Sequence, residues 1–175
     1  MFIGSGGNNV IAGIQVLQHR LYKNDGKGHF AIDAAAFPQS QTNVSVAAVQ
    51  DINKDGFPDL FIGSRSLPGR YGVDPPHALL LNDGQGHFHP MPGADQILAK
   101  AGMITDAVWA DIIGEATPEL ITVGDFNFPH VFRVSDGKIE EVTTNLADYK
   151  GMWQRMAITD WNADGKADLV LGNVG

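Results

Sequence analysis

The stretch Asp51-Ile-Asn-Lys-Asp-Gly-Phe-Pro-Asp-Leu60 is the most informative part of this 175-residue chain. Oxygen-bearing side chains stand at alternate positions, Asp51, Asn53 and Asp55, then a glycine follows, and Asp59 comes ninth. Ca²⁺ takes about six to eight oxygen ligands, and a tight loop supplies them from alternate side chains and from the backbone carbonyl at position 7. Glycine at position 6 permits the sharp turn. The stretch therefore predicts a calcium loop.

A second copy of this pattern, Asp160-Trp-Asn-Ala-Asp-Gly-Lys-Ala-Asp168, lies near the end of the chain. Each copy is followed by a short apolar run, which is typical of a buried strand rather than a helix. The competing interpretation is a pair of solvated turns stabilised by their own aspartates, but two such copies favour calcium. The predicted ligands are Asp51, Asn53, Asp55, Phe57 and Asp59 in one loop, and Asp160, Asn162, Asp164, Lys166 and Asp168 in the other.

A third, imperfect copy spans residues 111–119. Asp111, Glu115 and Glu119 keep acids at positions 1, 5 and 9, but Ile113 offers no oxygen at position 3. Ala116 replaces the glycine, and an alanine resists the left-handed turn by roughly 1 kcal/mol. We therefore expect weak calcium binding or none in this copy, and two Ca²⁺ sites in the chain.

Other elements also recur, about every 50–60 residues. Asn-Asp-Gly or Ser-Asp-Gly between apolar runs predicts a strand reversal. Repeats of this length, with four strands each, indicate the blades of a β-propeller. The apolar runs after the acidic loops are 2–5, 61–64, 121–124 and 170–173; the reversals begin at Asn24, Asn82 and Ser135; strands are expected over Ile14–Tyr22, 44–49, 78–81, 107–110, 131–134 and 157–159.

The predicted fold is all-β, a β-propeller segment of about three four-stranded antiparallel blades with calcium loops between strands A and B. The strand order is B-C-D, A-B-C-D, A-B-C-D and A-B. Closed propellers have about four to eight blades, so we expect the chain to be part of a longer protein or several copies to close one ring. Residues 1–175 then form a single partial propeller with repeat units at roughly 1–43, 44–104, 105–156 and 157–175.

Composition narrows the classes of function. The net charge of −8 argues against nucleic acid and against an anionic membrane surface as partners. The chain has no cysteine, which excludes disulfides and zinc–thiolate sites within it. No apolar run is long enough for a membrane span, so membrane insertion is not expected.

In a meander of strands, successive connections alternate between the two ends of the sheet. The acidic loops and the Asp-Gly turns are therefore expected at one end, and the longer B–C and D–A connections at the other. Irregular loops on a rigid scaffold are where binding usually occurs, and arginine and aromatic residues dominate interface energetics. The alternative for each such residue is simple packing between blades. The candidate ligand-binding residues are Arg70, Tyr71, Phe126, Phe128 and Trp153.

The acidic loop, the apolar run ending in glycine and the Asn-Asp-Gly-x-Gly-x-Phe turn together resemble the FG-GAP or VCBS repeat of integrin α-subunit propellers and many bacterial secreted proteins. Residues 63–71, 75–84 and 105–111 are most similar to the cartilage acidic protein (ASPIC-type) family. The resemblance covers nearly the whole chain. It implies calcium as a structural ion and a role in binding or adhesion.

We therefore expect a calcium-stabilised, non-enzymatic module that binds a protein or a glycan on the face of the B–C and D–A loops. Loops of extracellular modules bind calcium with Kd values around 10⁻⁴–10⁻³ M, which places the chain outside the cell, on its surface or in a periplasm. One alternative is a catalytic propeller such as a calcium-dependent polysaccharide lyase, for which Arg70, Tyr71 and His77 are the candidates. The other is a structural subunit of a larger assembly.

Overall fold

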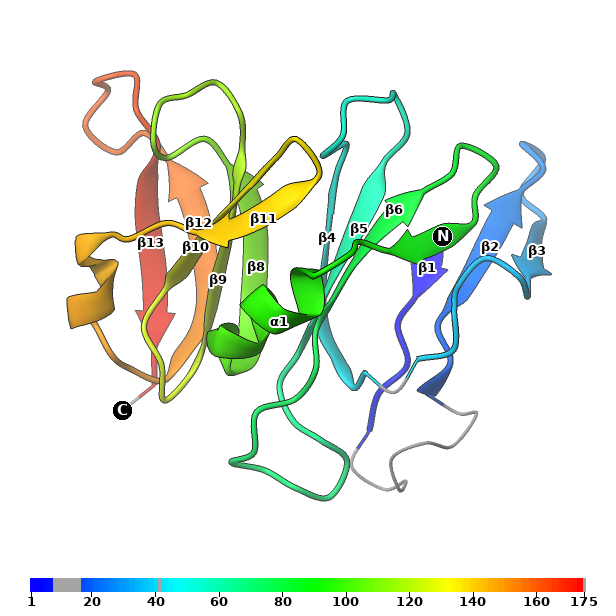
Figure 1. Ribbon diagram of the computed structural model, residues 1–175, viewed down its shortest axis with the longest axis horizontal. Helices are drawn as coiled ribbons and strands as arrows, with labels where there is room; N and C mark the ends of the chain where they lie inside the picture. The colour runs from blue at the N-terminus through cyan, green and yellow to red at the C-terminus, as the bar shows by residue number, and fades with distance from the viewer. Residues whose placement is uncertain (8–16, 41, 175) are drawn as a thin grey trace.

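The computed structural model describes residues 1–7, 17–40 and 42–174 and consists mainly of antiparallel strands arranged side by side in four sheets (Figure 1). In chain order the sheets have three, four, four and two strands, and we name them blades 1 to 4. Blade 1 comprises β1 (Phe2–Ile3), β2 (Arg20–Asn24) and β3 (Phe30–Asp33); blade 2 comprises β4 (Val44–Gln50), β5 (Asp59–Ser64), β6 (Ala78–Asn82) and β7 (Phe88–Pro90); blade 3 comprises β8 (Met103–Ala110), β9 (Glu119–Asp125), β10 (His130–Ser135) and β11 (Lys138–Glu141); blade 4 comprises β12 (Trp153–Thr159) and β13 (Asp168–Asn173).

This arrangement confirms the predicted all-β propeller segment and its strand order. One predicted strand was too long. The strand expected over Ile14–Tyr22 begins at Arg20, and residues 14–16 lie outside the described part of the chain. Residues 17–19 leave the ladder because they bond elsewhere: the Ser5 hydroxyl donates to the Gln18 carbonyl, and the Gln18 amide donates to the Pro38 carbonyl.

Two of the Asp-Gly turns are stabilised by their aspartate. Asp83 accepts hydrogen bonds from the backbone N–H groups of Gln85 and His87, and its other oxygen contacts the His87 ring. Asp25 does the same with Lys27 and His29. These bonds explain why the same residue types recur at both turns, and why the histidines are structural.

The core lies between neighbouring blades. Buried residues of blades 2 and 3, among them Phe61, Ile104 and Phe132, form one cluster. A second cluster joins blade 2 to Phe37 and Ala36, which follow blade 1. The helical segments are short: α1 (Ala94–Leu98), η2 (Ala99–Ala101) and η3 (Asn145–Asp148).

The α1 helix was not predicted, and it buries Ala94 and Leu98 in the core between blades 2 and 3. Within the described residues, no helix has the length and apolar character required to cross a lipid bilayer.

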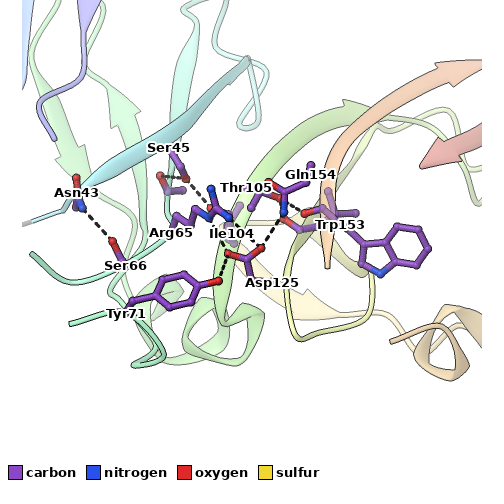
Figure 2. Close-up of polar contacts among 12 residues, drawn as sticks. Asn43, Ser45, Arg65, Ser66, Tyr71, Ile104, Thr105, Asp125, Trp153 and Gln154 are labelled. Carbon is purple, nitrogen blue, oxygen red and sulfur yellow. Dashed lines mark hydrogen bonds and ion pairs between the residues drawn. The ribbon is translucent and has the colours of Figure 1, made fainter. Parts of the chain in front are cut away.

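Adjacent blades are also joined by hydroxyl groups near the start of their first strands. The Ser45 hydroxyl of β4 donates to the Ile104 carbonyl of β8 at 2.6 Å (Figure 2). Thr105 of β8 repeats this contact with the Trp153 carbonyl of β12, also at 2.6 Å. Both donors occupy the irregular position where the pairing with the second strand shifts. Gln154 stands at the same shift in blade 4.

All acidic loops and Asp-Gly turns lie at one end of the sheets, the top of Figure 1. Contacts within blade 2 support this placement. The Phe57 ring lies so close to Gly84 that a Cβ there would be 2.6 Å from it, and the Asn82 N–H donates to Asp59 at 2.8 Å. The connection between β5 and β6, residues 64–77, lies at the opposite end.

Candidate functional site

Three acidic loops connect the first and second strands of blades 2, 3 and 4; we name them the first (51–59), second (111–119) and third (160–168) acidic loop. In the first loop, Asp51 accepts hydrogen bonds from the backbone N–H groups of Asp55 and Gly56 at 3.1 and 2.9 Å. Asp59 is buried and accepts from Ile52 at 3.0 Å. The first and last acids thereby close the loop around its own amides.

The third loop has the same construction. Asp160 accepts from Asp164 and Gly165 at 3.0 and 2.8 Å, and Asp168 accepts from Trp161 at 2.8 Å. Matching hydrogen bonds from matching positions show that the two sequence copies fold into the same local structure.

The second loop keeps this backbone shape despite its altered sequence. Asp111 accepts from Glu115 and Ala116 at 3.2 and 2.9 Å, and the buried Glu119 accepts from Ile112 at 3.1 Å. Each loop needs two residues at positive φ. In the first and third loops these are a non-glycine residue at position 4 and a glycine at position 6. In the second loop the glycine, Gly114, is at position 4 and the non-glycine, Ala116, is at position 6, with φ of 85° and 58°.

The loops differ in how their acidic charge is balanced. In the second loop, Glu115 forms an ion pair with Arg133 of β10 at 2.9 Å, and Arg133 also contacts Glu140 at 3.3 Å. Leu81 is the residue of blade 2 that corresponds to Arg133. The strand register shows this, because Leu80 pairs with Leu60 in blade 2 and Phe132 pairs with Leu120 in blade 3. A guanidinium therefore faces the second loop where an aliphatic side chain stands beside the first.

In the first loop the acids repel one another. Burial raises the pKa of Asp59, and the charges of Asp55 and Asp51 raise it further, while hydrogen bonds from Asn82 and Ile52 lower it. These carboxylates are thus close enough to interact electrostatically, and a bound cation would relieve the repulsion.

The donor set of the first and third loops fits a hard cation in type and spacing. Carboxylate, amide and carbonyl oxygens are what Ca²⁺ prefers, and a carboxylate oxygen that accepts one N–H retains a second lone pair. In this conformation Asn53 turns its amide toward Asp55 at 2.8 Å. Among the described residues, no three acidic or histidine side chains converge as a ready-made metal cluster, so metal binding requires these side chains to rotate.

At the opposite end, a carboxylate joins three blades (Figure 2). Asp125, at the end of β9, has a fully buried side chain and pairs with Arg65 at 2.6 Å. It also accepts hydrogen bonds from the Tyr71 hydroxyl at 3.0 Å and from the Gln154 amide at 2.8 Å. We name these four residues the Asp125 cluster. The ion pair raises the pKa of Arg65, and partial burial together with the carboxylate raises that of Tyr71.

Two exposed aromatic rings meet here, that of Tyr71 in the cluster and that of Phe126 next to it. Tyr71 and Phe126 meet edge to face, with ring centroids 6.2 Å apart, and they are 55% and 61% exposed. Phe126 has a φ of 59°, a left-handed conformation that costs a bulky residue about 1–3 kcal/mol. Because Phe126 buries little surface, packing does not explain this cost.

The side chains of the other candidate ligand-binding residues take no part in the Asp125 cluster. Phe128 stacks on His130 at 4.2 Å, the Trp153 indole donates to the Tyr149 carbonyl, and Arg70 is exposed. Of the lyase candidates, Tyr71 donates to Asp125, whereas the buried His77 accepts from the Ser64 N–H; no contact among the described residues joins them.

Sequence reasoning did not assign a role to Arg65, Asp125 or Gln154. A signal was present, because the glycine that ends each apolar run is followed by Ser5, Ser64 and Asn173 in three blades and by an acid only at Asp125.

Four-stranded antiparallel blades, each with an acidic loop after the first strand, define the class of a β-propeller. The family model of the FG-GAP repeat matches residues 42–72, which include β4, the first acidic loop and β5. Neither the curated proteins nor the solved structures gave a match to this chain. The FG-GAP match supports an FG-GAP repeat family and indicates a propeller-type binding or adhesion module.

Proposed function

We propose that this chain is a calcium-stabilised, non-enzymatic module that works outside the cell, on its surface or in a periplasm. We also propose that, among the FG-GAP and VCBS propellers, it belongs with the cartilage acidic protein group. The proposed ligand is a protein or a glycan, held on the face formed by the B–C and D–A connections. Further blades, from the same protein or from other copies, complete the ring.

The observation that carries the binding face is the exposed pair Tyr71 and Phe126. The Asp125 cluster fixes the loop of blade 2 against the end of β9, so the Tyr71 ring is held in place by its hydroxyl. Rigid aromatic rings gain contact area at a small entropic cost, and the strained backbone of Phe126 favours a role in recognition.

Calcium is proposed at the first and third acidic loops and not at the second. In the first loop, Asp51, Asn53, Asp55 and Asp59 would supply side-chain oxygens and Phe57 its carbonyl; Asp160, Asn162, Asp164, Asp168 and the Lys166 carbonyl would do so in the third. The bound ion would supply positive charge between carboxylates that now repel one another. In the second loop, Arg133 already pairs with Glu115.

The extracellular address follows from this proposal. Sites with Kd near 10⁻⁴–10⁻³ M fill in millimolar calcium and stay empty at cytosolic concentrations. A module that depends on them is therefore suited to the outside of the cell.

The test measures binding to a panel of immobilised glycans and extracellular matrix proteins in about 2 mM calcium. This concentration is above the range of Kd values expected for the calcium loops. Tyr71→Ala and Phe126→Ala are compared with Phe30→Ala, which removes a half-exposed ring from β3. We expect the first two variants to bind at least about tenfold more weakly. The control variant should bind as tightly as the unsubstituted chain. Equal effects in all three variants would place the ligand elsewhere.

A further inference from the structure

A cavity of about 530 Å³ lies where the segment after blade 1 meets blade 2. It lies toward the end of the sheets that carries the B–C and D–A connections, and no residue of the Asp125 cluster lines it. One wall is the beginning of β6 and the end of β7 with the start of α1, and the other is formed by residues 38–40 and by Thr42. The volume is within the range of about 300–1,000 Å³ that is usual for small-molecule sites.

Most of the cavity wall is apolar and held in a fixed shape. Leu79, Leu80 and Met91 line it, and all three are almost fully buried. Pro76, Pro90 and Pro92 also line it, and proline restricts the backbone to a narrow range of conformations. The cavity is therefore preformed, and water within it finds few hydrogen-bond partners along this wall.

The opposite wall carries a polar group of three side chains. His19 Nε2 lies 2.7 Å from the Thr42 hydroxyl and 2.8 Å from the Ser40 hydroxyl, and the two hydroxyls are 2.6 Å apart. His19 and Thr42 are more than nine-tenths buried, so their hydrogen bonds are shielded from bulk water.

The hydrogen atoms of this group can be assigned. The Ser5 N–H points at His19 Nδ1 at 3.4 Å, so Nδ1 is the acceptor and Nε2 carries the proton. Burial lowers the pKa of His19 to about 4, which keeps the ring neutral at pH 7. Nε2–H then donates to the hydroxyls, and a single hydroxyl hydrogen serves the contact between Ser40 and Thr42.

One hydroxyl hydrogen remains without an acceptor among the described residues. The same assignment excludes His19 as a general base for Ser40, because its Nε2 is already protonated. The group is thus built to donate a hydrogen bond and not to activate a nucleophile.

Charge limits what the cavity accepts. Among the described residues that line it there is no lysine or arginine, and Asp95 supplies a carboxylate. Moving an anion to such a site would leave its charge without a partner.

We infer that this cavity binds an uncharged, mainly apolar small molecule whose carbonyl or ether oxygen accepts a hydrogen bond from the Ser40–Thr42 hydroxyl pair. The apolar part lies against Leu79, Leu80 and Met91. Neither the acidic loops nor the Asp125 cluster lines the cavity, so binding here can be measured separately from calcium binding and from contacts to Tyr71 and Phe126.

The test uses the full chain with ¹³C-labelled methionine methyl groups and three small probes. Acetophenone has an apolar ring and one acceptor, cumene has the same shape without an acceptor, and benzoate is an anion. We expect acetophenone to shift the Met91 methyl signal saturably, with an affinity about three- to tenfold higher than that of cumene, the usual contribution of one neutral hydrogen bond. Benzoate should bind more weakly than either.

The double variant Ser40→Ala/Thr42→Val removes both hydroxyls and should remove the advantage of acetophenone over cumene, while Ser135→Ala, on the exposed end of β10, should leave it intact. Cumene binding to the double variant serves as the check that the cavity is still folded. A Met91 signal that no probe moves, tighter binding of benzoate, or an unchanged preference in a double variant that still binds cumene would each overturn the inference. If the double variant does not fold, the affinity order of the three probes on the unsubstituted chain decides alone.

Discussion

The first and second acidic loops have the same backbone shape but balance their charge differently. Both close on an aspartate at position 1 and a buried acid at position 9. In the first loop the charges of Asp55 and Asp51 help to raise the pKa of the buried Asp59, whereas in the second Arg133 pairs with Glu115. Hydrogen bonds to the loop's own amides are therefore enough to set its conformation, and the guanidinium beside the second loop is a separate contribution.

The largest expected effect comes from removing the buried acid at position 9. Asp59→Ala leaves the N–H groups of Ile52 and Asn82 without their acceptor, and each unpaired buried donor costs about 1–3 kcal/mol. We expect a loss of roughly 3 kcal/mol in the free energy of unfolding, measured by urea denaturation in chelator.

Glu119→Ala is the matched variant in the second loop. It leaves only the Ile112 N–H without its acceptor, because the other oxygen of Glu119 has no partner among the described residues. Its loss should be about half as large. Equal losses would mean that hydrogen bonding is not what distinguishes these positions.

Calcium should stabilise the first and third loops and leave the second unaffected. At a free concentration about tenfold above Kd, each site contributes about 1.4 kcal/mol, so two sites raise Tm by roughly 6–12 °C relative to chelator. Calorimetry at both conditions measures this shift.

Variants at position 5 separate the loops. Asp55→Asn and Asp164→Asn should each remove about half of the calcium-dependent shift, because each takes one carboxylate from a proposed site. Glu115→Gln, the same change in the second loop, should leave the shift intact. A calcium response that survives both aspartate changes would refute the proposed sites.

Acid should destabilise the chain without involving the loops. Burial lowers the pKa of His77 to about 4, and an unfolded histidine titrates near 6.5. As the pH falls below 6.5 the unfolded state gains the proton first, so stability drops by about 1.4 kcal/mol per pH unit until about pH 4. His19 shifts in the same direction.

Denaturation at pH 7.5 and 5 should therefore show a loss of roughly 2 kcal/mol from His77, of equal size with calcium and with chelator. A loss that calcium abolishes would instead implicate the acidic loops.

The smallest expected effect is that of Arg133→Leu, which gives the second loop the residue that stands beside the first. Because Glu115 and Glu140 are half to two-thirds exposed, their ion pairs contribute less than about 1 kcal/mol. The loss should be independent of calcium. Isothermal titration should still find two sites; a third would show that Arg133 alone keeps calcium out of the second loop.

The sequence predicts repeating parts of this molecule better than unique ones. Strand order, turns and the position of the acidic loops follow from motifs that recur, since each copy supports the interpretation of the others. The length of β2 was missed because Gln18 and His19 bond to segments that only the folded chain brings near.

The Asp125 cluster could not be predicted from the sequence for the same reason, because it joins segments that are far apart in the chain. Arg65 and Asp125 are 60 residues apart, and no local pattern predicts that their loops meet. Similarly, Arg133 could be recognised as the partner of Glu115 only once the register of β9 and β10 was known.

The hydroxyl contacts of Ser45 and Thr105 have a consequence for how such a protein can change over time. Each donor recognises a main-chain carbonyl of the next blade, and every residue type provides that group. A duplicated or exchanged blade would thus meet its neighbour without any matching substitution. Blades can therefore be added while the side chains around these contacts are substituted.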